Sequence, residues 1–156
     1  MSGMNTSKAD ISLPMDAQDL LPHRPPMRLV DRLIGEADQA GTVECRLPAD
    51  SVVADAAGQI EPAAFLELIA QAYAAVKGYD DLLHRQPVHE GFLVGCRHVR
   101  IRQPARVGQL LTIRVKTIGI LAGFAIAEGE VWCEKELLAS GTVKFWVPAG
   151  EEGKPQ

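Results

Sequence analysis

The stretch Ile60–Asp80, IEPAAFLELIAQAYAAVKGYD, decides the fold of this chain. Between residues 63 and 76 only Glu67 and Gln71 are strongly polar, and no glycine or proline interrupts the run. Alanine and leucine favour helix, and Pro62 is tolerated in a first helical turn. The stretch therefore predicts one long helix that begins just after Pro62.

The far end and the polarity of this helix indicate where it lies. Lys77 followed by Gly78 predicts its end, because a cation suits the negative helix terminus and glycine can adopt a left-handed cap. Glu67 and Gln71 lie one turn apart, but alanines continue their side of the helix in both directions. A helix that is apolar nearly all round is usually buried. Since one sheet covers only one side of a helix, we expect a second layer, most simply another subunit.

A carboxylate inside a buried helix has chemical consequences. It must be paired, hydrogen-bonded or protonated, and desolvation raises its pKa. An acid held in that state can transfer protons near neutral pH. The alternative is a helix with one wet side, on which Glu67 and Gln71 meet solvent. Periodicity alone does not separate the two interpretations.

Strand patterns dominate the rest of the chain. Short links between them, including a turn at residues 38–40, imply antiparallel neighbours. We therefore expect an α+β fold in which an antiparallel sheet wraps around one long central helix. A short helix is expected at residues 15–21, stopped by Pro22. The expected strands are residues 27–37, 41–47, 91–103, 109–118, 120–133 and 137–147, with further turns at residues 104–108 and 134–136.

Length and composition bound the class of protein. The 156 residues fit a single domain, expected at 15–149, with a flexible N-terminal leader at 1–14 and a flexible tail at 150–156. A net charge of -4 gives no reason to expect nucleic acid. No apolar run approaches the roughly 20 residues of a membrane span, and no secretory signal is present. The three cysteines are odd in number and widely spaced, which indicates reduced thiols in the cytoplasm.

His23 is the second candidate for chemistry. Three prolines surround it in Leu21–Pro26, LPHRPP, so its backbone has little freedom to lose. A histidine in such a loop is more often a surface residue than a catalyst. With a buried Glu67 it would form an acid/base couple, because histidine titrates near physiological pH. Sequence spacing does not show that the two groups meet.

A basic region follows the helix. From His84 to Lys116 the sequence has one acid, Glu90. A solvated sheet face and a docking surface for an acidic protein both explain such a region. Alternation along the strand places His98, Arg100 and Arg102 on one face. Aromatic residues do not interleave the charges, which argues against nucleic acid, and the histidines match no zinc spacing. The candidate docking residues are Arg97, Arg100, Arg102 and Arg106.

Three segments resemble one family. LLPHRPPMRLVDRLI (20–34) is similar to the LPHRxPFLLVDRV segment of the FabZ-type 3-hydroxyacyl-[acyl-carrier-protein] dehydratases. LELIAQA (66–72) resembles that family's LEAMAQ, and GCRHVRIRQPARVGQL (95–110) fits its GxxxxR[FI][RK]xPxxxGxxL. The segments occur in the family order. The sequences of the first two segments most closely resemble the FabZ-like branch associated with aryl-polyene synthesis.

The resemblance implies a hotdog fold and a homodimer with two active sites at the subunit interface, while assembly beyond a dimer is left open. The family's catalytic histidine falls on His23 and its catalytic glutamate on Glu67, and the two come from different subunits. Gln71 matches the glutamine near that glutamate, and Gly95 matches a glycine of the strand that lines the substrate tunnel. The family needs no metal or other cofactor, since an acyl carrier protein presents the substrate on a phosphopantetheine arm.

The helix entrance departs from the family pattern. The family has Phe-Pro-Gly where this chain has Ile60-Glu61-Pro62, and proline lacks the N–H that glycine would offer to the thioester oxygen. The N–H groups of Ala63 and Ala64 are the remaining candidates for an oxyanion site at the helix N-terminus.

The expected reaction is the dehydration of a 3-hydroxyacyl thioester to the trans-2-enoyl thioester. His23 would take the α-proton, and Glu67, protonated because it is buried, would protonate the leaving hydroxyl. One alternative is an acyl thioesterase on the same fold, in which Glu67 activates water. The other is a non-catalytic hotdog protein that binds acyl chains.

Overall fold

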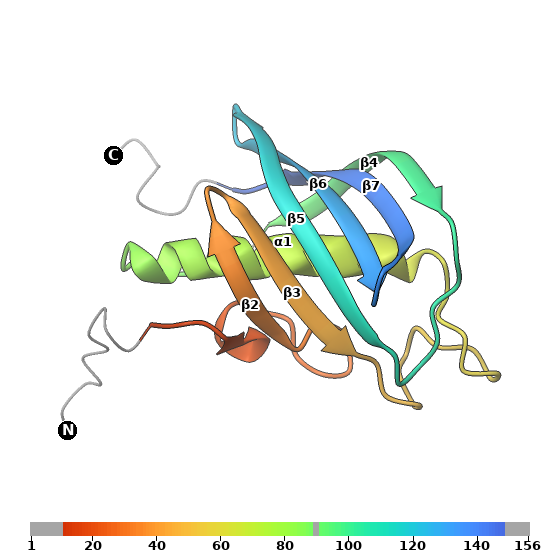
Figure 1. Cartoon of the computed structure of the whole chain (residues 1–156). Helices are drawn as coiled ribbons and strands as arrows, with labels where there is room; N and C mark the ends of the chain where they lie inside the picture. The colour runs from red at the N-terminus through yellow and green to blue at the C-terminus, as the bar shows by residue number, and fades with distance from the viewer. Residues whose placement is uncertain (1–10, 89–90, 149–156) are drawn as a thin grey trace, which may run out of the picture.

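The computed structural model describes residues 11–88 and 91–148 (Figure 1). In this part of the chain, one antiparallel sheet of seven strands curves around one long helix. The sheet order is β1-β2-β3-β5-β6-β7-β4, so β4 is an edge strand although it lies mid-chain in sequence. The elements are β1 (Met15–Asp16), the 3-10 helix η2 (Ala17–Asp19), β2 (Arg32–Ala37), β3 (Ala40–Arg46), α1 (Ala64–Leu83), β4 (Phe92–Ile101), β5 (Leu110–Leu121), β6 (Phe124–Cys133) and β7 (Glu136–Trp146).

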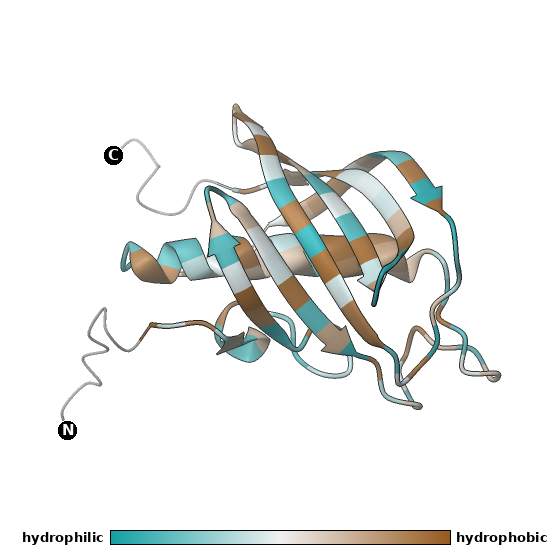
Figure 2. Cartoon of the chain, viewed as in Figure 1, coloured by the Kyte–Doolittle hydropathy of each residue, from teal (hydrophilic) through white to brown (hydrophobic). Residues whose placement is uncertain are grey.

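This architecture confirms the predicted α+β fold with a sheet wrapped around a central helix. The two strands before the helix and the four after it are all present. Hydrophobic and hydrophilic residues alternate along the strands (Figure 2), as expected for a sheet with one face on the core. The N-terminal segment differs from the prediction, because residues 15–21 form a two-residue strand and a single 3-10 turn instead of a short helix.

Two predicted strand boundaries were wrong, the second because of a bulge. Residues 27–31, predicted as strand, are a turn and an irregular segment, and β2 begins only at Arg32. The predicted break near residue 119 does not occur, since β5 continues to Leu121 through a register shift between Thr117 and Gly119. The hairpin turn lies at Ala122-Gly123, where both residues have positive φ. A bulge interrupts the alternation that sequence patterns rely on, so it looks like a strand end.

The helix also extends beyond its predicted end. Gly78 does not terminate α1, which continues to Leu83. A Cβ at Gly78 would lie 1.8 Å from the carbonyl oxygen of Leu20. Glycine therefore occupies this position because the N-terminal segment crosses the helix in direct contact with its backbone.

That crossing segment explains how the helix is buried. The sheet covers one side of α1, against residues such as Leu68 and Ile69, which are fully buried. The other side is covered in part by residues of the same chain: Leu20, Leu21, Leu29 and Val30 are all buried, and all belong to the core around α1. The predicted second layer is thus supplied at least partly by the N-terminal segment, which carries His23.

The expected leader is partly ordered around this core. Ile11 and Leu13 are partly buried and pack against the core, although both fall within the leader predicted at 1–14. Residues 1–10 and the predicted tail at 150–156 lie outside the described residues.

Candidate active site

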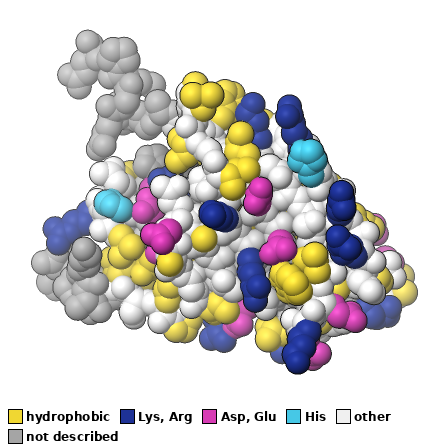
Figure 3. Space-filling view, turned by 45° about the horizontal axis from the view of Figure 1, so that its top comes forward, with side chains coloured by type: hydrophobic (Ala, Val, Ile, Leu, Met, Phe, Trp, Pro, Cys, Tyr) yellow, Lys and Arg dark blue, Asp and Glu magenta, His cyan; other side chains and the backbone are white. Residues whose placement is uncertain are grey.

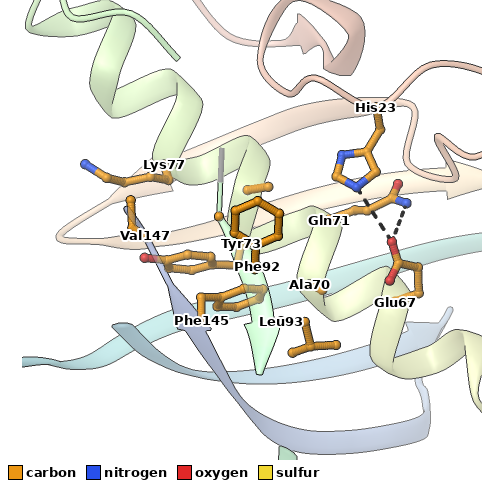
Figure 4. Close-up of a pocket in the computed structure, with 12 residues that line it drawn as sticks. His23, Glu67, Ala70, Gln71, Tyr73, Lys77, Phe92, Leu93, Phe145 and Val147 are labelled. Carbon is orange, nitrogen blue, oxygen red and sulfur yellow. Dashed lines mark hydrogen bonds and ion pairs between the residues drawn. The ribbon is translucent and has the colours of Figure 1, made fainter. Parts of the chain in front are cut away.

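The structure brings His23 and Glu67 together within one chain (Figure 4). His23 Nε2 lies 3.8 Å from Glu67 Oε1. The family resemblance implied that the two groups come from different subunits, so this meeting inside one chain differs from the expectation. His23 is held by the segment that crosses α1, and Glu67 lies in the first turns of that helix. A titratable imidazole and a carboxyl group at this separation can exchange protons with one bound molecule.

Gln71 fixes the geometry of this pair. Its side chain is buried, with 1 % of its surface exposed. Its Oε1 accepts hydrogen bonds from the backbone N–H of Leu29 at 2.8 Å and of Val30 at 3.4 Å. Its Nε2 donates to the carbonyl of Met27 at 2.8 Å and to Glu67 Oε1 at 2.9 Å. One amide therefore fastens the His23 segment to the helix and orients the carboxylate that faces His23.

Local contacts hold the His23 loop. The Arg24 guanidinium donates to the carbonyls of Leu21 at 3.0 Å and His23 at 2.9 Å. Met27 N–H donates to the carbonyl of Arg24 at 2.9 Å, which closes a turn around Pro25 and Pro26. The Nδ1 atom of His23 is buried and has no hydrogen-bond partner in the described part of the chain. The imidazole therefore presents Nε2 to Glu67.

A cavity of about 220 Å³ lies beside the pair. His23, Glu67 and Gln71 form its polar part. The ring of Tyr73 stacks on that of Phe145 with centroids 4.7 Å apart. The remaining lining residues are mostly apolar: Ala70, Ala74, Lys77, Gly91, Phe92, Leu93 and Val147.

Sequence reasoning missed most of this lining. Ala70, Ala74 and Lys77 share the face of α1 that carries Glu67 and Gln71, so helical periodicity could have found them. Tyr73 also comes from α1. Phe92, Leu93 and Phe145 come from strands far along the chain, and no local signal indicates that they meet the helix here.

Glu67 is less buried than the sequence indicated. Its side chain keeps 42 % of its surface exposed in the single chain, and that of His23 keeps 33 %. The expectation of a dry carboxyl group is therefore wrong for one chain alone. The physical reason is local: on this side the helix faces a cavity and the exposed edge strand β4, not a second packed layer.

The predicted oxyanion donors do not line the cavity. The N–H of Ala64 already donates to the carbonyl of Glu61 at 2.9 Å, so it is committed to the first turn of the helix. The N–H groups of Phe65 and Leu66 are committed in the same way, to Pro62 and Ala63. The Ala63 N–H is not a donor in any of these bonds. Because both residues lie outside the cavity lining, an oxyanion site at Ala63 or Ala64 stays a prediction.

Gly95 lies on β4 beyond the stretch that lines the cavity. It follows a register shift between Leu93 and Gly95, and a Cβ there would meet nothing within 4 Å. The lining residues from this part of the chain are Gly91, Phe92 and Leu93. The structure thus brings His23, Glu67 and Gln71 together, and it places Gly95, Ala63 and Ala64 outside the cavity wall.

The basic region is exposed but less regular than predicted. Figure 3 shows basic side chains gathered along one edge of the face it presents. A register shift between Arg97 and Arg100, with His98 at positive φ, breaks the predicted alternation, and Arg102 lies just beyond β4. Arg106 has a structural role, since its guanidinium donates to the carbonyl of Ala57 at 2.7 Å. Arg97, Arg100 and Arg102 remain as exposed cations at the sheet edge.

Electrostatics perturb two groups near the core. Burial raises the pKa of the Tyr73 hydroxyl, and the carboxylates of Asp81 and Asp80 raise it further. Tyr73 is therefore a neutral part of the cavity wall. Burial raises the pKa of the Cys45 thiol still more strongly, with Asp31 and Glu44 adding to the effect.

The described residues contain neither a candidate metal site nor a candidate membrane-spanning helix. No group of three or more His, Cys, Asp or Glu side chains is arranged to hold a metal ion there. Among the same residues, no helix has the length and apolar character to cross a membrane.

Several solved structures are similar to this chain. A chain of the dehydratase heterocomplex ApeI:P from Xenorhabdus doucetiae superposes with a TM-score of 0.81 at 24 % identity, covering 88 % of this chain and 94 % of that one. An uncharacterized protein from Pyrococcus horikoshii gives a TM-score of 0.63 at 21 % identity, with 92 % and 100 % covered. A hypothetical thioesterase from Streptococcus pneumoniae, solved with coenzyme A, gives 0.56 at 12 % identity, with 75 % and 84 % covered.

These likenesses confirm the hotdog fold. No curated protein matches the sequence. Residues 15–154 match the ApeP-like family, described as ApeP dehydratase. This match confirms the resemblance to FabZ-like dehydratases of the aryl-polyene branch, and the chain belongs to the ApeP-like dehydratase family.

Proposed function

We propose that this protein dehydrates a 3-hydroxyacyl thioester to the trans-2-enoyl thioester. The observation that carries the proposal is the approach of His23 Nε2 to Glu67 Oε1, 3.8 Å apart at one end of a mostly apolar cavity. Membership of a dehydratase family supports the loss of water as the reaction. The apolar lining suits an acyl chain, whereas the polar end suits the reacting carbons.

His23 acts as the base and Glu67 as the acid in this mechanism. His23 Nε2 takes the proton from the carbon next to the thioester carbonyl, and the electron pair passes into the enolate. As the pair returns to form the carbon–carbon double bond, the bond to the 3-hydroxyl breaks and Glu67 donates the proton that makes it water. The proton on His23 then returns to Glu67, which resets the site. A positioned acid or base of this type increases the reaction rate by roughly 100- to 10,000-fold.

Gln71 determines which oxygen of Glu67 carries the proton. Its Nε2 donates to Glu67 Oε1, so Oε1 acts as an acceptor. The acidic proton then belongs on Oε2, the oxygen left for the substrate hydroxyl. The amide thus acts as a positioning group for the acid.

A thioesterase is the second candidate, favoured by one observation. Glu67 is 42 % exposed in the single chain, so water can reach it. In that reaction the carboxylate would activate water against the thioester carbonyl, and His23 would have no necessary role. Ile60-Glu61-Pro62 lacks the glycine that the family has at the helix start, which favours a third candidate, a non-catalytic protein that binds acyl chains.

One assay separates these functions. The protein is incubated with 3-hydroxyacyl thioesters and with saturated acyl thioesters. Mass spectrometry follows the loss of water, and a colorimetric thiol reagent follows the release of free thiol. A dehydratase forms the enoyl product from the first substrate only, a thioesterase releases thiol from both, and a binding protein does neither.

Substitutions then assign the residues. His23→Ala and Glu67→Gln are expected to lower kcat by roughly 100-fold or more with an unchanged circular dichroism spectrum. His84→Ala and Glu134→Gln are the matched controls, because both side chains are exposed and lie outside the cavity. Undiminished turnover in His23→Ala or Glu67→Gln would remove that residue from the mechanism.

We further propose that an acyl carrier protein presents the substrate on its phosphopantetheine arm, so that no metal or other cofactor takes part. The exposed Arg97, Arg100 and Arg102 suit an acidic partner. Changing Arg100 and Arg102 to Glu is expected to raise KM for the carrier-bound substrate but not for the same acyl group on pantetheine. Lys135→Glu, in the β6–β7 turn, is the control. Equal KM values for the carrier-bound substrate would contradict the docking surface.

The proposed assembly is a homodimer through the free edge of β4. This edge strand exposes Phe92, Leu93, Val94, Val99 and Ile101. Unpaired N–H and C=O groups beside an apolar row favour pairing with a second strand. The similar structure from X. doucetiae is a dehydratase heterocomplex, so a different dehydratase chain is the competing occupant. The free thiols Cys45, Cys96 and Cys133 agree with a cytoplasmic location, which we also propose.

A further inference from the structure

Two residues separate the catalytic cavity from a second, smaller cavity. Tyr73 and Lys77 line both the 220 Å³ cavity that contains His23 and Glu67 and another of about 90 Å³. The smaller cavity lies between the C-terminal half of α1 and the end of β5 near its hairpin turn. Its other lining residues are Glu36, Gln39, Val76, Asp80, Thr117 and Ile120.

Both residues of this partition are held in place. The Tyr73 side chain is 6 % exposed, and its ring stacks on Phe145 with an interplanar angle of 11°. Lys77 Nζ lies 3.1 Å from Asp81 Oδ1 and 3.6 Å from Asp80 Oδ2. Asp81 is 3 % exposed, so the ion pair anchors the lysine to a buried carboxylate. The ion pairs thereby hold the Lys77 ammonium beside both cavities, while 38 % of its side-chain surface stays exposed.

The partition lies at a defined distance from the reacting groups. Lys77 follows Glu67 by ten residues on the same helix, which places it about 15 Å farther along the axis. Between them, Ala70 and Ala74 contribute small side chains to the cavity wall. An acyl chain whose reacting carbons lie at His23 and Glu67 would run over these alanines and end at Tyr73 and Lys77.

We propose that Tyr73 and Lys77 form an end wall that limits the length of the acyl chain, and that the smaller cavity is closed to chains while Lys77 is anchored. The inference rests on the proposed function, because it assumes that the acyl thioester reacts at His23 and Glu67. Chains that reach beyond the wall must displace the lysine from Asp81. The part of the smaller cavity formed by Val76 and Ile120 would accommodate an apolar chain end once the wall is removed.

The test is a comparison of kcat/KM across chain lengths in opposite variants. Lys77→Ala opens the wall, and it is expected to raise kcat/KM for a 3-hydroxydodecanoyl thioester relative to 3-hydroxyoctanoyl by about tenfold, since one methylene in an apolar pocket is worth at least that much. Ala74→Leu fills the cavity before the wall and is expected to shift the preference toward 3-hydroxybutanoyl. Lys77→Arg, which keeps the ion pair, is expected to restore the wild-type length profile. Lys135→Ala is the control for loss of a surface cation.

The outcomes distinguish this inference from the proposed function. If the wild-type protein dehydrates 3-hydroxyacyl thioesters but neither Lys77→Ala nor Ala74→Leu changes the length profile, the end wall is wrong and the dehydratase stands. If no thioester is dehydrated, the dissociation constants of saturated acyl thioesters of different chain lengths are measured in the same variants. If the dependence of affinity on chain length is then the same in the variants as in the wild type, the end wall is wrong. Lys77→Ala removes the ammonium that lies 3.1 Å from Asp81 Oδ1; if that variant does not fold, Ala74→Leu decides.

Discussion

The two walls of the cavity beside His23 and Glu67 are built differently. The inner wall, formed by α1 and the crossing segment 20–30, holds His23 and Glu67 through a buried glutamine that is 1 % exposed. The outer wall is contributed by β4, an edge strand on which Phe92 and Leu93 remain 45 % and 41 % exposed. One chain therefore completes the geometry of its acid/base pair but leaves apolar surface uncovered beside it.

This difference indicates what a partner would add. The inner wall needs no second chain to bring His23 to Glu67, because the hydrogen bonds of Gln71 that fasten the segment to the helix lie within the chain. The outer wall would gain from pairing, which covers the apolar row on β4 and removes water from the mouth of the cavity. A partner at β4 would then also reduce the exposure of the Glu67 side chain, which is 42 % in the single chain.

The largest expected effect comes from breaking the contact that supports the inner wall. In Gly78→Ala the new Cβ would meet the backbone of Leu20, which cannot move without displacing the His23 segment. We expect a loss of about 3 kcal/mol or more in the free energy of unfolding, measured by urea denaturation. Gly35→Ala is the matched control, because a Cβ there meets nothing within 4 Å. Equal unfolding midpoints for the two variants would mean that the crossing is not tight.

A smaller loss is expected when the buried amide is removed. Gln71→Leu leaves the carbonyl of Met27 and the N–H of Leu29 without their partner. Each buried unsatisfied group costs about 1–3 kcal/mol, so a loss of at least about 2 kcal/mol in the free energy of unfolding is expected. The kcat for dehydration should fall as well, because Glu67 loses its orienting donor. Gln18→Leu, at an exposed position, is the control; equal stability of the two variants would contradict the role of Gln71.

The outer wall is tested by charging the β4 edge. Val94 and Val99 are 51 % and 38 % exposed, and changing both to Lys should weaken self-association at least about tenfold, or 1.4 kcal/mol, without loss of secondary structure. Sedimentation velocity over a range of concentrations measures the effect. Val52→Lys, at a valine that is 53 % exposed on a loop, is the control. If the wild-type protein stays monomeric until a different dehydratase chain is added, the homodimer is wrong and the edge belongs to a heterocomplex.

The smallest effect compares two thiols. Burial raises the pKa of the Cys45 thiol, so the reactive thiolate is scarce below that raised pKa. Cys96 is exposed on β4. At mildly alkaline pH, iodoacetamide should modify Cys96 in the native protein and Cys45 only after unfolding, as followed by peptide mass. If β4 pairs as proposed, modification of Cys96 should slow as the protein concentration rises; a rate independent of concentration would contradict pairing through that edge.

The sequence by itself determined the class of fold, and it predicted two candidate reacting groups. The uninterrupted apolar run at 63–76 requires a helix, and alternation with short links requires an antiparallel sheet. His23 and Glu67 followed from residue chemistry and from a resemblance to known dehydratases. These features are local, since they depend on residues within a few positions of each other.

Only the tertiary structure decided how those parts combine. The four bonds of Gln71 include three that span 41 to 44 residues, and no periodicity reports such distances. The end of α1 at Leu83, the exposure of Glu67 and the partition at Tyr73 and Lys77 likewise depend on which segments cross the helix. Local sequence patterns specify the helix and the strands, because backbone conformation depends on neighbouring residues. The site depends instead on the path that the chain takes between the helix and the strands.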